Sequence, residues 1–202
     1  STTASFKFYE DPAKNPLSTP SGKMEYESQT LMGWFPDDKE RAPTATYVPG
    51  GPASEGWTHD EDPWGERAKT YPIRVVSQTN DWLHHSQYVD VPWTREARPY
   101  IIGFDGYAYS PVWINPVDAA ARGIKDGDIV RIYNERGSVL AGAMVTEKVM
   151  QQAVRLDKAG GDDQLSPDIN RGGNPNSINV TPPMHKHGYG LACQYYLAQI
   201  EK

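Results

Sequence analysis

The sequence has almost no cysteine, no long apolar run and no basic run, and each of these absences excludes a class of protein. Its single cysteine, Cys193, excludes an intramolecular disulfide framework and a metal site built from cysteines alone. No apolar stretch approaches the roughly 20 residues of a membrane-spanning helix. The net charge is −6 and no basic run exceeds a dipeptide, so nucleic acid is not an expected partner.

The start of the sequence has neither a signal peptide nor an initiator methionine. Residues 1–9 contain no basic segment followed by an apolar core. This start favours a processed or excised part of a longer protein. The compartment stays open: the cytoplasm is favoured, and the periplasm is the alternative if a twin-arginine signal precedes this segment.

Residues 1–70 are expected to form a long irregular N-terminal arm, because prolines punctuate them and hydrophobic periodicity is nearly absent. One strand is expected at residues 23–27. Residues 46–64 combine a Gly-Gly-Pro turn with tryptophans, which favours an arm packed on another surface. A flexible extension is the alternative.

Residues 71–202 have the pattern of a small β-barrel. Pro116 fits the first turn of a short helix at residues 117–122, with Asn115 as its N-cap and Gly123 after its end. A hairpin turn is expected at Arg136-Gly137. Short β-branched runs predict strands at residues 73–77, 112–115, 129–134, 138–146, 153–157 and 194–201. The fold class is therefore mainly β, with six strands closing a barrel around one small helix.

The segment INPVDAAARGIKDGDIVRIYNERGSVLAGA, residues 114–143, carries a specific resemblance. It resembles the molybdopterin-dinucleotide-binding C-terminal domain of the dimethyl sulfoxide reductase family of molybdenum and tungsten oxidoreductases. The motifs at residues 18–25, 85–87 and 173–176 fit the same family. Within it, residues 93–96, 103–107 and 111–118 are most similar to the large subunit of pyrogallol–phloroglucinol transhydroxylase.

The resemblance implies a six-stranded double-psi β-barrel at residues 71–202 that holds one side of a bis(molybdopterin guanine dinucleotide) cofactor with molybdenum or tungsten. The remaining N-terminal domains of the same enzyme would supply the metal ligand and the substrate pocket. An iron–sulfur subunit is a further expected partner, and a hydroxylated aromatic is the leading substrate. The chain is not expected to be catalytic alone, because the chemistry resides in the cofactor.

The loop after the first predicted strand holds the first group of candidate cofactor-binding residues. Such a dinucleotide needs many hydrogen bonds, which amide and hydroxyl groups supply without the desolvation cost of a buried ion. A capped turn at residues 79–81 and a surface pair of histidines at residues 84–85 are the structural alternatives. The candidates are Thr79, Asn80, His85, Ser86 and Gln87.

Two further groups follow. Asp118 could accept hydrogen bonds from the guanine edge, with Asn115 beside it, although both also suit a helix N-terminus. Asn176, and next Asn174, are candidates for the pterin, although asparagine is also a common turn residue. Lys186 could meet a phosphate, and Gln194 is the last candidate.

The same sequence also contains features of other functions. The pair His185 and His187 is a minimal zinc fragment without further ligands in a recognised spacing, so no metal site is assigned. Cys193 reads as a small buried apolar residue. A stand-alone barrel that serves as a protein-interaction module is the main rival. A self-processing pyruvoyl decarboxylase would need the bond between Gly137 and Ser138.

Overall fold

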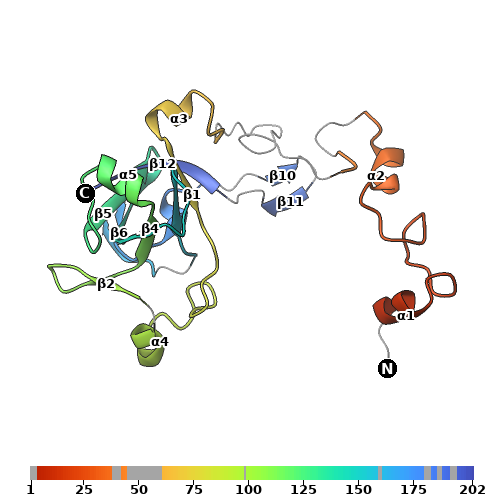
Figure 1. The fold of residues 1–202 in the computed structure, drawn as a ribbon, viewed down its shortest axis with the longest axis horizontal. Coiled ribbons are helices and arrows are strands. Elements are labelled where there is room, and N and C mark those ends of the chain that lie inside the picture. The colour runs from red at the N-terminus through yellow and green to blue at the C-terminus, as the bar shows by residue number, and fades with distance from the viewer. Residues whose placement is uncertain are drawn as a thin grey trace.

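The computed structural model describes residues 4–37, 42–44, 61–97, 99–158, 161–179, 183–185, 188–191 and 195–202. Within these ranges, five short α-helices and one 3-10 helix accompany the strands (Figure 1). No helix in these ranges is long and apolar enough to cross a membrane. The elements, in chain order, are α1 (Ala4–Glu10), α2 (Gln29–Trp34), α3 (Arg67–Thr70), β1 (Ile73–Val76), α4 (Pro92–Ala97), β2 (Ile101–Ile102), β3 (Ala108–Tyr109), β4 (Pro111–Ile114), α5 (Pro116–Ala121), β5 (Ile129–Asn134), β6 (Gly137–Val145), β7 (Ala153–Leu156), β8 (Gln164–Ser166), β9 (Ile169–Asn170), η2 (Pro175–Ser177), β10 (Pro183–His185), β11 (Gly188–Leu191) and β12 (Tyr195–Glu201).

Six strands close into a barrel in the order β4-β7-β1-β12-β5-β6, and pairing of β4 with β6 joins the two ends. The pairs β1–β7 and β4–β6 are parallel, and the other neighbours in the ring are antiparallel. The short strands β9 and β8 extend from the first half of β6. This closed ring with crossing parallel pairs confirms the predicted double-psi type of barrel and the mainly β class.

The barrel core follows from the period-2 alternation of the strands. Along β5, Val130, Ile132 and Asn134 are buried and the residues between them are partly exposed. Side chains at alternate positions point to opposite faces of a strand, so one face of each strand fills the interior. The largest fully buried apolar side chains are Ile73, Val75, Val112, Ile114, Val130, Ile132, Val139, Leu156, Ile178, Tyr196, Leu197 and Ile200.

The predicted strands of the barrel are confirmed to within one residue, and so is the helix after Asn115. The Asn115 Oδ1 accepts a hydrogen bond from the Val117 N–H, as an N-cap does. The predicted hairpin turn at residues 136–137 is one residue too late, because Gly137 already pairs with Asn134. The turn is therefore formed by residues 135–136.

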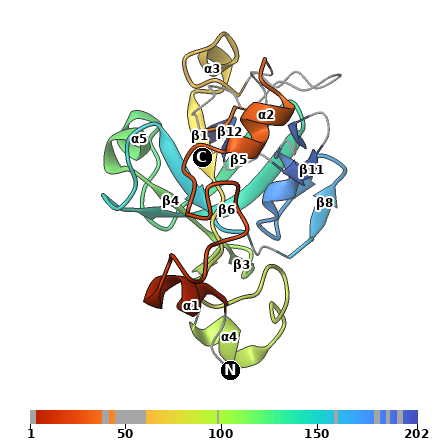
Figure 2. The same ribbon diagram turned by 90° about the vertical axis from the view of Figure 1, so that its right-hand side faces the viewer.

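The strand expected at residues 23–27 is wrong. Serine, threonine and glycine bond locally here: the Leu17 N–H donates to the Gly22 oxygen, and the Thr19 hydroxyl donates to the Lys23 oxygen. Such local bonds compete with strand formation. The arm instead contains α1 and α2, which lie apart from the barrel in Figure 1 and in front of it in the view of Figure 2.

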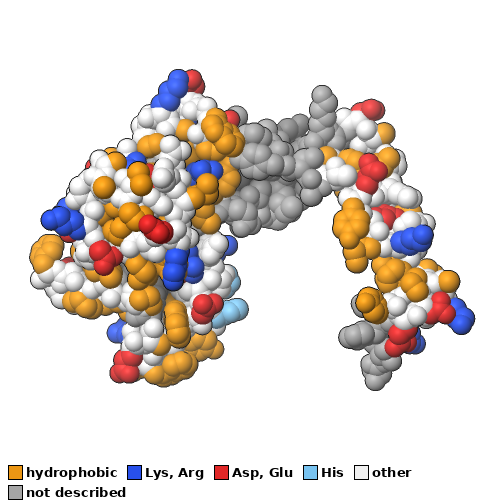
Figure 3. Space-filling view, viewed as in Figure 1, with side chains coloured by type: hydrophobic (Ala, Val, Ile, Leu, Met, Phe, Trp, Pro, Cys, Tyr) orange, Lys and Arg blue, Asp and Glu red, His pale blue; other side chains and the backbone are white. Residues whose placement is uncertain are grey.

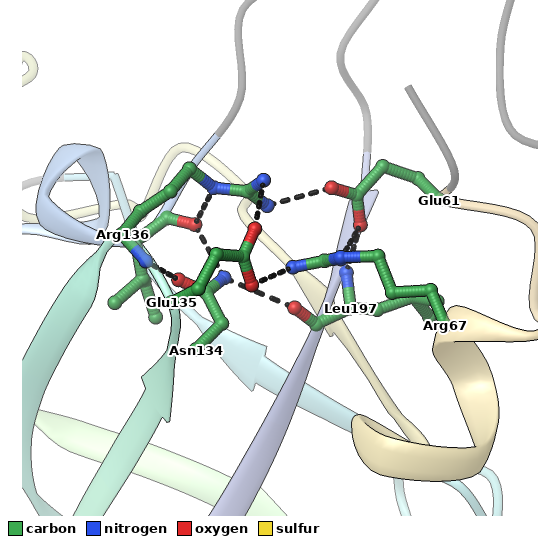
Figure 4. Close-up of polar contacts among 7 residues, drawn as sticks. Glu61, Arg67, Asn134, Glu135, Arg136 and Leu197 are labelled. Carbon is green, nitrogen blue, oxygen red and sulfur yellow. Dashed lines mark hydrogen bonds and ion pairs between the residues drawn. The ribbon is translucent and has the colours of Figure 1, made fainter. Parts of the chain in front are cut away.

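Residues 61–70 are tied to the barrel by a polar cluster (Figure 4). The buried Glu61 carboxylate pairs with Arg136 Nη2 at 2.6 Å and with Arg67 Nη1 at 2.9 Å. It also accepts a hydrogen bond from the Leu197 N–H of β12. Glu135 lies 2.6 Å from Arg67 Nη2 and completes the cluster. These contacts link the segment before β1 to the β5–β6 turn and to β12.

Candidate functional site

The loop of residues 78–90 follows β1 and begins with a buried asparagine. Asn80 is only 7% exposed, and its Oδ1 accepts hydrogen bonds from the Trp82 and Leu83 N–H groups at 3.0 and 2.8 Å. Its Nδ2 is buried and has no hydrogen-bond partner within the described ranges. Buried polar groups are nearly always paired, so this free donor is the strongest local sign of a ligand.

Most of the rest of this loop is exposed, although Leu83 is buried. The Gln87 N–H donates to the His84 oxygen at 3.0 Å, which closes a tight turn. Within and after that turn, His85 and Tyr88 adopt positive φ angles of 55° and 66°. Non-glycine residues in this conformation are uncommon and are frequent at functional sites. The candidates Thr79, His85, Ser86 and Gln87 are all exposed here.

A second loop, residues 157–163, lies against the first. Because β1 and β7 are parallel, the segments that follow them leave the barrel at the same end. The Lys158 N–H donates to the Gln78 oxygen at 2.7 Å. A Cβ built on Gly161 would be 3.9 Å from Val89 Cγ2, which is ordinary contact distance. Sequence reasoning did not identify this loop, because its glycines and aspartates match no motif.

The loop of residues 171–179 joins the same surface through Gly172. A Cβ at Gly172 would lie 2.0 Å from the Gly161 oxygen, so the two backbones touch. The Ser110 hydroxyl, just before β4, contacts the Gly172 oxygen at 3.4 Å. The structure therefore brings the asparagine loop predicted near the pterin into one surface with residues 78–90.

Within that loop the two candidate asparagines differ. Asn174 is the N-cap of η2, because its Oδ1 accepts a hydrogen bond from the Asn176 N–H at 3.1 Å. Asn176 itself is exposed, so its amide is accessible to a ligand. A cap residue retains its side-chain amide for other partners, so the prediction for both residues stands as a proposal.

Asn115 and Asp118 are not part of this surface. The end of β4 pairs with the start of β7, so α5 lies at the opposite end of the barrel from residues 78–90 (Figure 1). Asp118 is buried, and its Oδ2 accepts a hydrogen bond from the Gln152 N–H at 2.6 Å. The Asn115 Nδ2 donates to the Val149 oxygen. The polar groups of both side chains are used by the fold, which favours their structural interpretation.

The electrostatics beside the loops centre on Arg171, which sequence reasoning did not select. Its guanidinium lies 4.3 Å from the ring centroid of Tyr107 and donates to Asp163 at 2.9 Å. That hydrogen bond raises the pKa of Arg171. Burial, and then the Asp163 carboxylate, raise the pKa of Tyr107. The charge of Arg171 is thus neutralised locally by Asp163.

The remaining candidates, Lys186 and Gln194, lie outside the described residues, as does Cys193. No group of three histidine, cysteine, aspartate or glutamate side chains that could hold a metal occurs in the part of the chain that the structure describes. The Ser138 hydroxyl, at the start of β6, donates to the Asp168 oxygen between β8 and β9. That bond gives the serine a structural role.

Comparison with protein families matches residues 73–189 to the Molydopterin dinucleotide binding domain. The dimethyl sulfoxide/trimethylamine N-oxide reductase of Cereibacter sphaeroides is 33% identical over 96% of this chain. The dimethyl sulfoxide reductase DmsA of Escherichia coli K12 and the trimethylamine-N-oxide reductase of Salmonella typhi are each 34% identical over 96% of it.

The chain spans about 22% of the length of each of these relatives. Among solved structures, acetylene hydratase from Pelobacter acetylenicus matches with a TM-score of 0.65 at 19% identity, over 95% of this chain and 25% of that one. This likeness shows the fold alone. The family match covers more than half of the chain and includes all three loops, residues 78–90, 157–163 and 171–179. The chain belongs to the Molydopterin dinucleotide binding domain family, in the form found in reductases of the dimethyl sulfoxide and trimethylamine N-oxide type.

Proposed function

We propose that this chain binds and positions one side of a bis(molybdopterin guanine dinucleotide) cofactor, as one domain of a larger molybdenum or tungsten oxidoreductase. The observation that supports this most is the free Nδ2 of Asn80. Leaving a buried donor unpaired costs about 1–3 kcal/mol. A carbonyl, ring nitrogen or phosphate oxygen of the cofactor would remove that cost.

The surrounding groups suit the same ligand. A dinucleotide offers many hydrogen-bonding atoms and two negatively charged phosphates, and an acidic chain can bind it through amide and hydroxyl dipoles. Loops 78–90 and 171–179 present such groups on one surface. The residues proposed to contact the cofactor are Thr79, Asn80, His85, Ser86, Gln87, Asn174 and Asn176, with Lys186 and Gln194 as further candidates.

When bound, the cofactor supplies the metal centre at which an oxygen atom or a hydroxyl group is transferred. The residues of this chain bind and orient it, and we assign none of them a catalytic role. The protein ligand of the metal, the substrate pocket and an iron–sulfur subunit would belong to other parts of the enzyme. The relatives are named for sulfoxide and N-oxide reduction. The similarity to transhydroxylase and the hydroxylated aromatic substrate remain predictions.

The interaction-module alternative is not favoured, because the family match and the free Asn80 donor both point to a ligand. It makes a distinct prediction, since a module without a cofactor should not respond to guanine nucleotides. A nucleotide titration therefore separates the two functions.

The test is an NMR titration of the chain with GMP and GDP, with AMP as the reference. We expect millimolar binding, because only one side of the site is present, with shifts in residues 78–90 and 171–176. Asn80→Asp keeps the Oδ1 acceptor that closes the turn and removes the donor, so it should weaken these shifts. Asn15→Asp, in the arm, makes the same chemical change away from the loop. Unchanged binding by Asn80→Asp would contradict the role of this donor.

A further inference from the structure

One face of the β2–β3 hairpin packs against the barrel. A Cβ built on Gly142 would lie 2.2 Å from the Ile101 Cβ, so Ile101 packs directly on the backbone of β6. Tyr109, opposite Ile101 in the hairpin, is only 5% exposed. Their neighbours Ile102 and Ala108 point outward and are exposed. The hairpin therefore has a face fixed to the barrel and a free face.

The tip of the hairpin is held rigidly by bonds of its own. The Gly103 N–H donates to the Tyr107 oxygen, and the Gly106 N–H donates to the Gly103 oxygen, both at 2.9 Å. The Asp105 carboxylate accepts the Tyr107 N–H at 3.1 Å and the Tyr109 hydroxyl at 2.8 Å. Gly106 has a φ of 76°, which a side chain would strain. The conformation of the tip is thus set before any partner binds.

This rigid tip presents Phe104 fully to solvent. Its exposure is 102% of the reference value, so the ring does not pack against the part of the chain that the structure describes. Burying such a ring against a partner contributes about 1.5–3 kcal/mol. A pre-organised loop loses little conformational entropy on binding, and single exposed aromatics often dominate interfaces. Phe104 has the properties of an interface anchor.

Other exposed apolar side chains lie at the same end of the barrel. Trp93 on α4 is 71% exposed and Ile102 is 65% exposed. Figures 1 and 2 both place α4 and the hairpin at this end, and Figure 3 shows hydrophobic side chains gathered there. The loop of residues 78–90 leads directly into α4. We call Trp93, Ile102 and Phe104 the anchor patch.

The hairpin is also braced against the candidate cofactor surface. Arg171 stacks on Tyr107 of the hairpin and donates to Asp163 of the 157–163 loop. Tyr107 and Tyr109 meet edge to face, with ring centroids 4.9 Å apart. The position of the anchor patch is therefore mechanically linked to the loops proposed to hold the cofactor.

We propose that Phe104 inserts into an apolar pocket on the part of the same longer polypeptide that lies outside these 202 residues. This inference rests on the proposed function, in which the chain is one domain of a larger enzyme. The relatives are several times longer than this chain, which spans about 22% of them. Because the anchor patch borders the cofactor surface, the protein that covers the cofactor from the other side approaches the patch as well.

The test places the photo-crosslinking residue p-benzoylphenylalanine at Phe104 in the longer polypeptide, followed by peptide mapping. The control carries the same residue at Met150, which is 64% exposed and lies two residues before Gln152, at the α5 end. We expect Phe104 to cross-link within one polypeptide to peptides outside the 202 residues, and Met150 not to do so. Cross-links to a second copy, to a separate subunit or within the 202 residues would overturn the proposal. So would a yield no higher than at Met150.

The same preparations separate this inference from the proposed function. Pterin content, measured by fluorescence of the released and oxidised pterin, reports cofactor binding independently of the cross-link. Pterin without the cross-link would refute the anchor and leave the proposed function standing. The cross-link without pterin would refute the proposed function and leave the anchor standing.

Discussion

Glu61 Oε1 lies 2.6 Å from Arg136 Nη2, across 75 residues of sequence (Figure 4). The pair joins the segment before β1 to the β5–β6 turn. Arg136 also donates from Nε to the Ile178 oxygen, and Asn134 Nδ2 donates to the oxygens of Ile178 and Leu197. The cluster thus fixes the chain on both sides of residues 179–196, which contain the candidates Lys186 and Gln194.

Glu61→Ala should destabilise the chain by about 3 kcal/mol, because it removes the buried carboxylate that Arg67 and Arg136 share. The two arginines would then share only the more exposed Glu135. The substitution also removes the acceptor of the Leu197 N–H. Urea denaturation followed by circular dichroism measures the free energy of unfolding. Glu66→Ala is the matched control, because its pair with Lys69 is exposed and should contribute less than about 0.5 kcal/mol. Equal effects of the two changes would show that the Glu61 cluster adds no stability.

Gly172→Ala should destabilise the barrel by about 1–3 kcal/mol, since the new methyl group would lie 2.0 Å from the Gly161 oxygen. The cost is steric, because the three nearest atoms, the Gly161 oxygen and carbonyl carbon and the Asp163 nitrogen, are backbone atoms that cannot rotate away. Thermal melting gives the loss of stability, and the GMP titration should show weakened binding because loops 157–163 and 171–179 are pushed apart. Gly33→Ala in α2 meets no atom within 4 Å and serves as the control. A melting point equal to that of Gly33→Ala would contradict the contact.

Local signals in the sequence predicted the barrel well. The Asn115 cap and the alternation in residues 129–134 depend on neighbouring residues, and both are confirmed. The free Nδ2 of Asn80 could not be predicted, because it depends on how the loop folds over that side chain. The Asp118 contact with Gln152 links residues far apart in the sequence. The prediction of a strand at residues 23–27 was wrong, because local hydrogen bonds from side chains form there instead.

Asp118→Ala should lower stability by about 1–3 kcal/mol, because the Gln152 N–H loses its buried acceptor. Asp118→Asn keeps an oxygen at the same position and should lose less. If Asp118 acts only in the fold, GMP should cause no chemical-shift changes at residues 115–118, and binding by Asp118→Asn should match the unmodified chain. A guanine-specific shift there, lost in Asp118→Asn, would instead support the predicted guanine contact.

The hydroxyl of Tyr109 should titrate in strongly alkaline solution. Burial raises its pKa to about 12, and its hydrogen bond to the Asp105 carboxylate adds to the shift. Because the folded-state pKa lies above the usual value near 10, the neutral hydroxyl stabilises the fold fully below about pH 10. That contribution is lost as the pH rises from about 10 to 12. Tyrosinate absorbance should show a group titrating near pH 12 that disappears in Tyr109→Phe and remains in Tyr9→Phe, which removes an exposed tyrosine of the arm. An unchanged titration near pH 12 in Tyr109→Phe would assign it to another tyrosine and contradict the raised pKa of Tyr109.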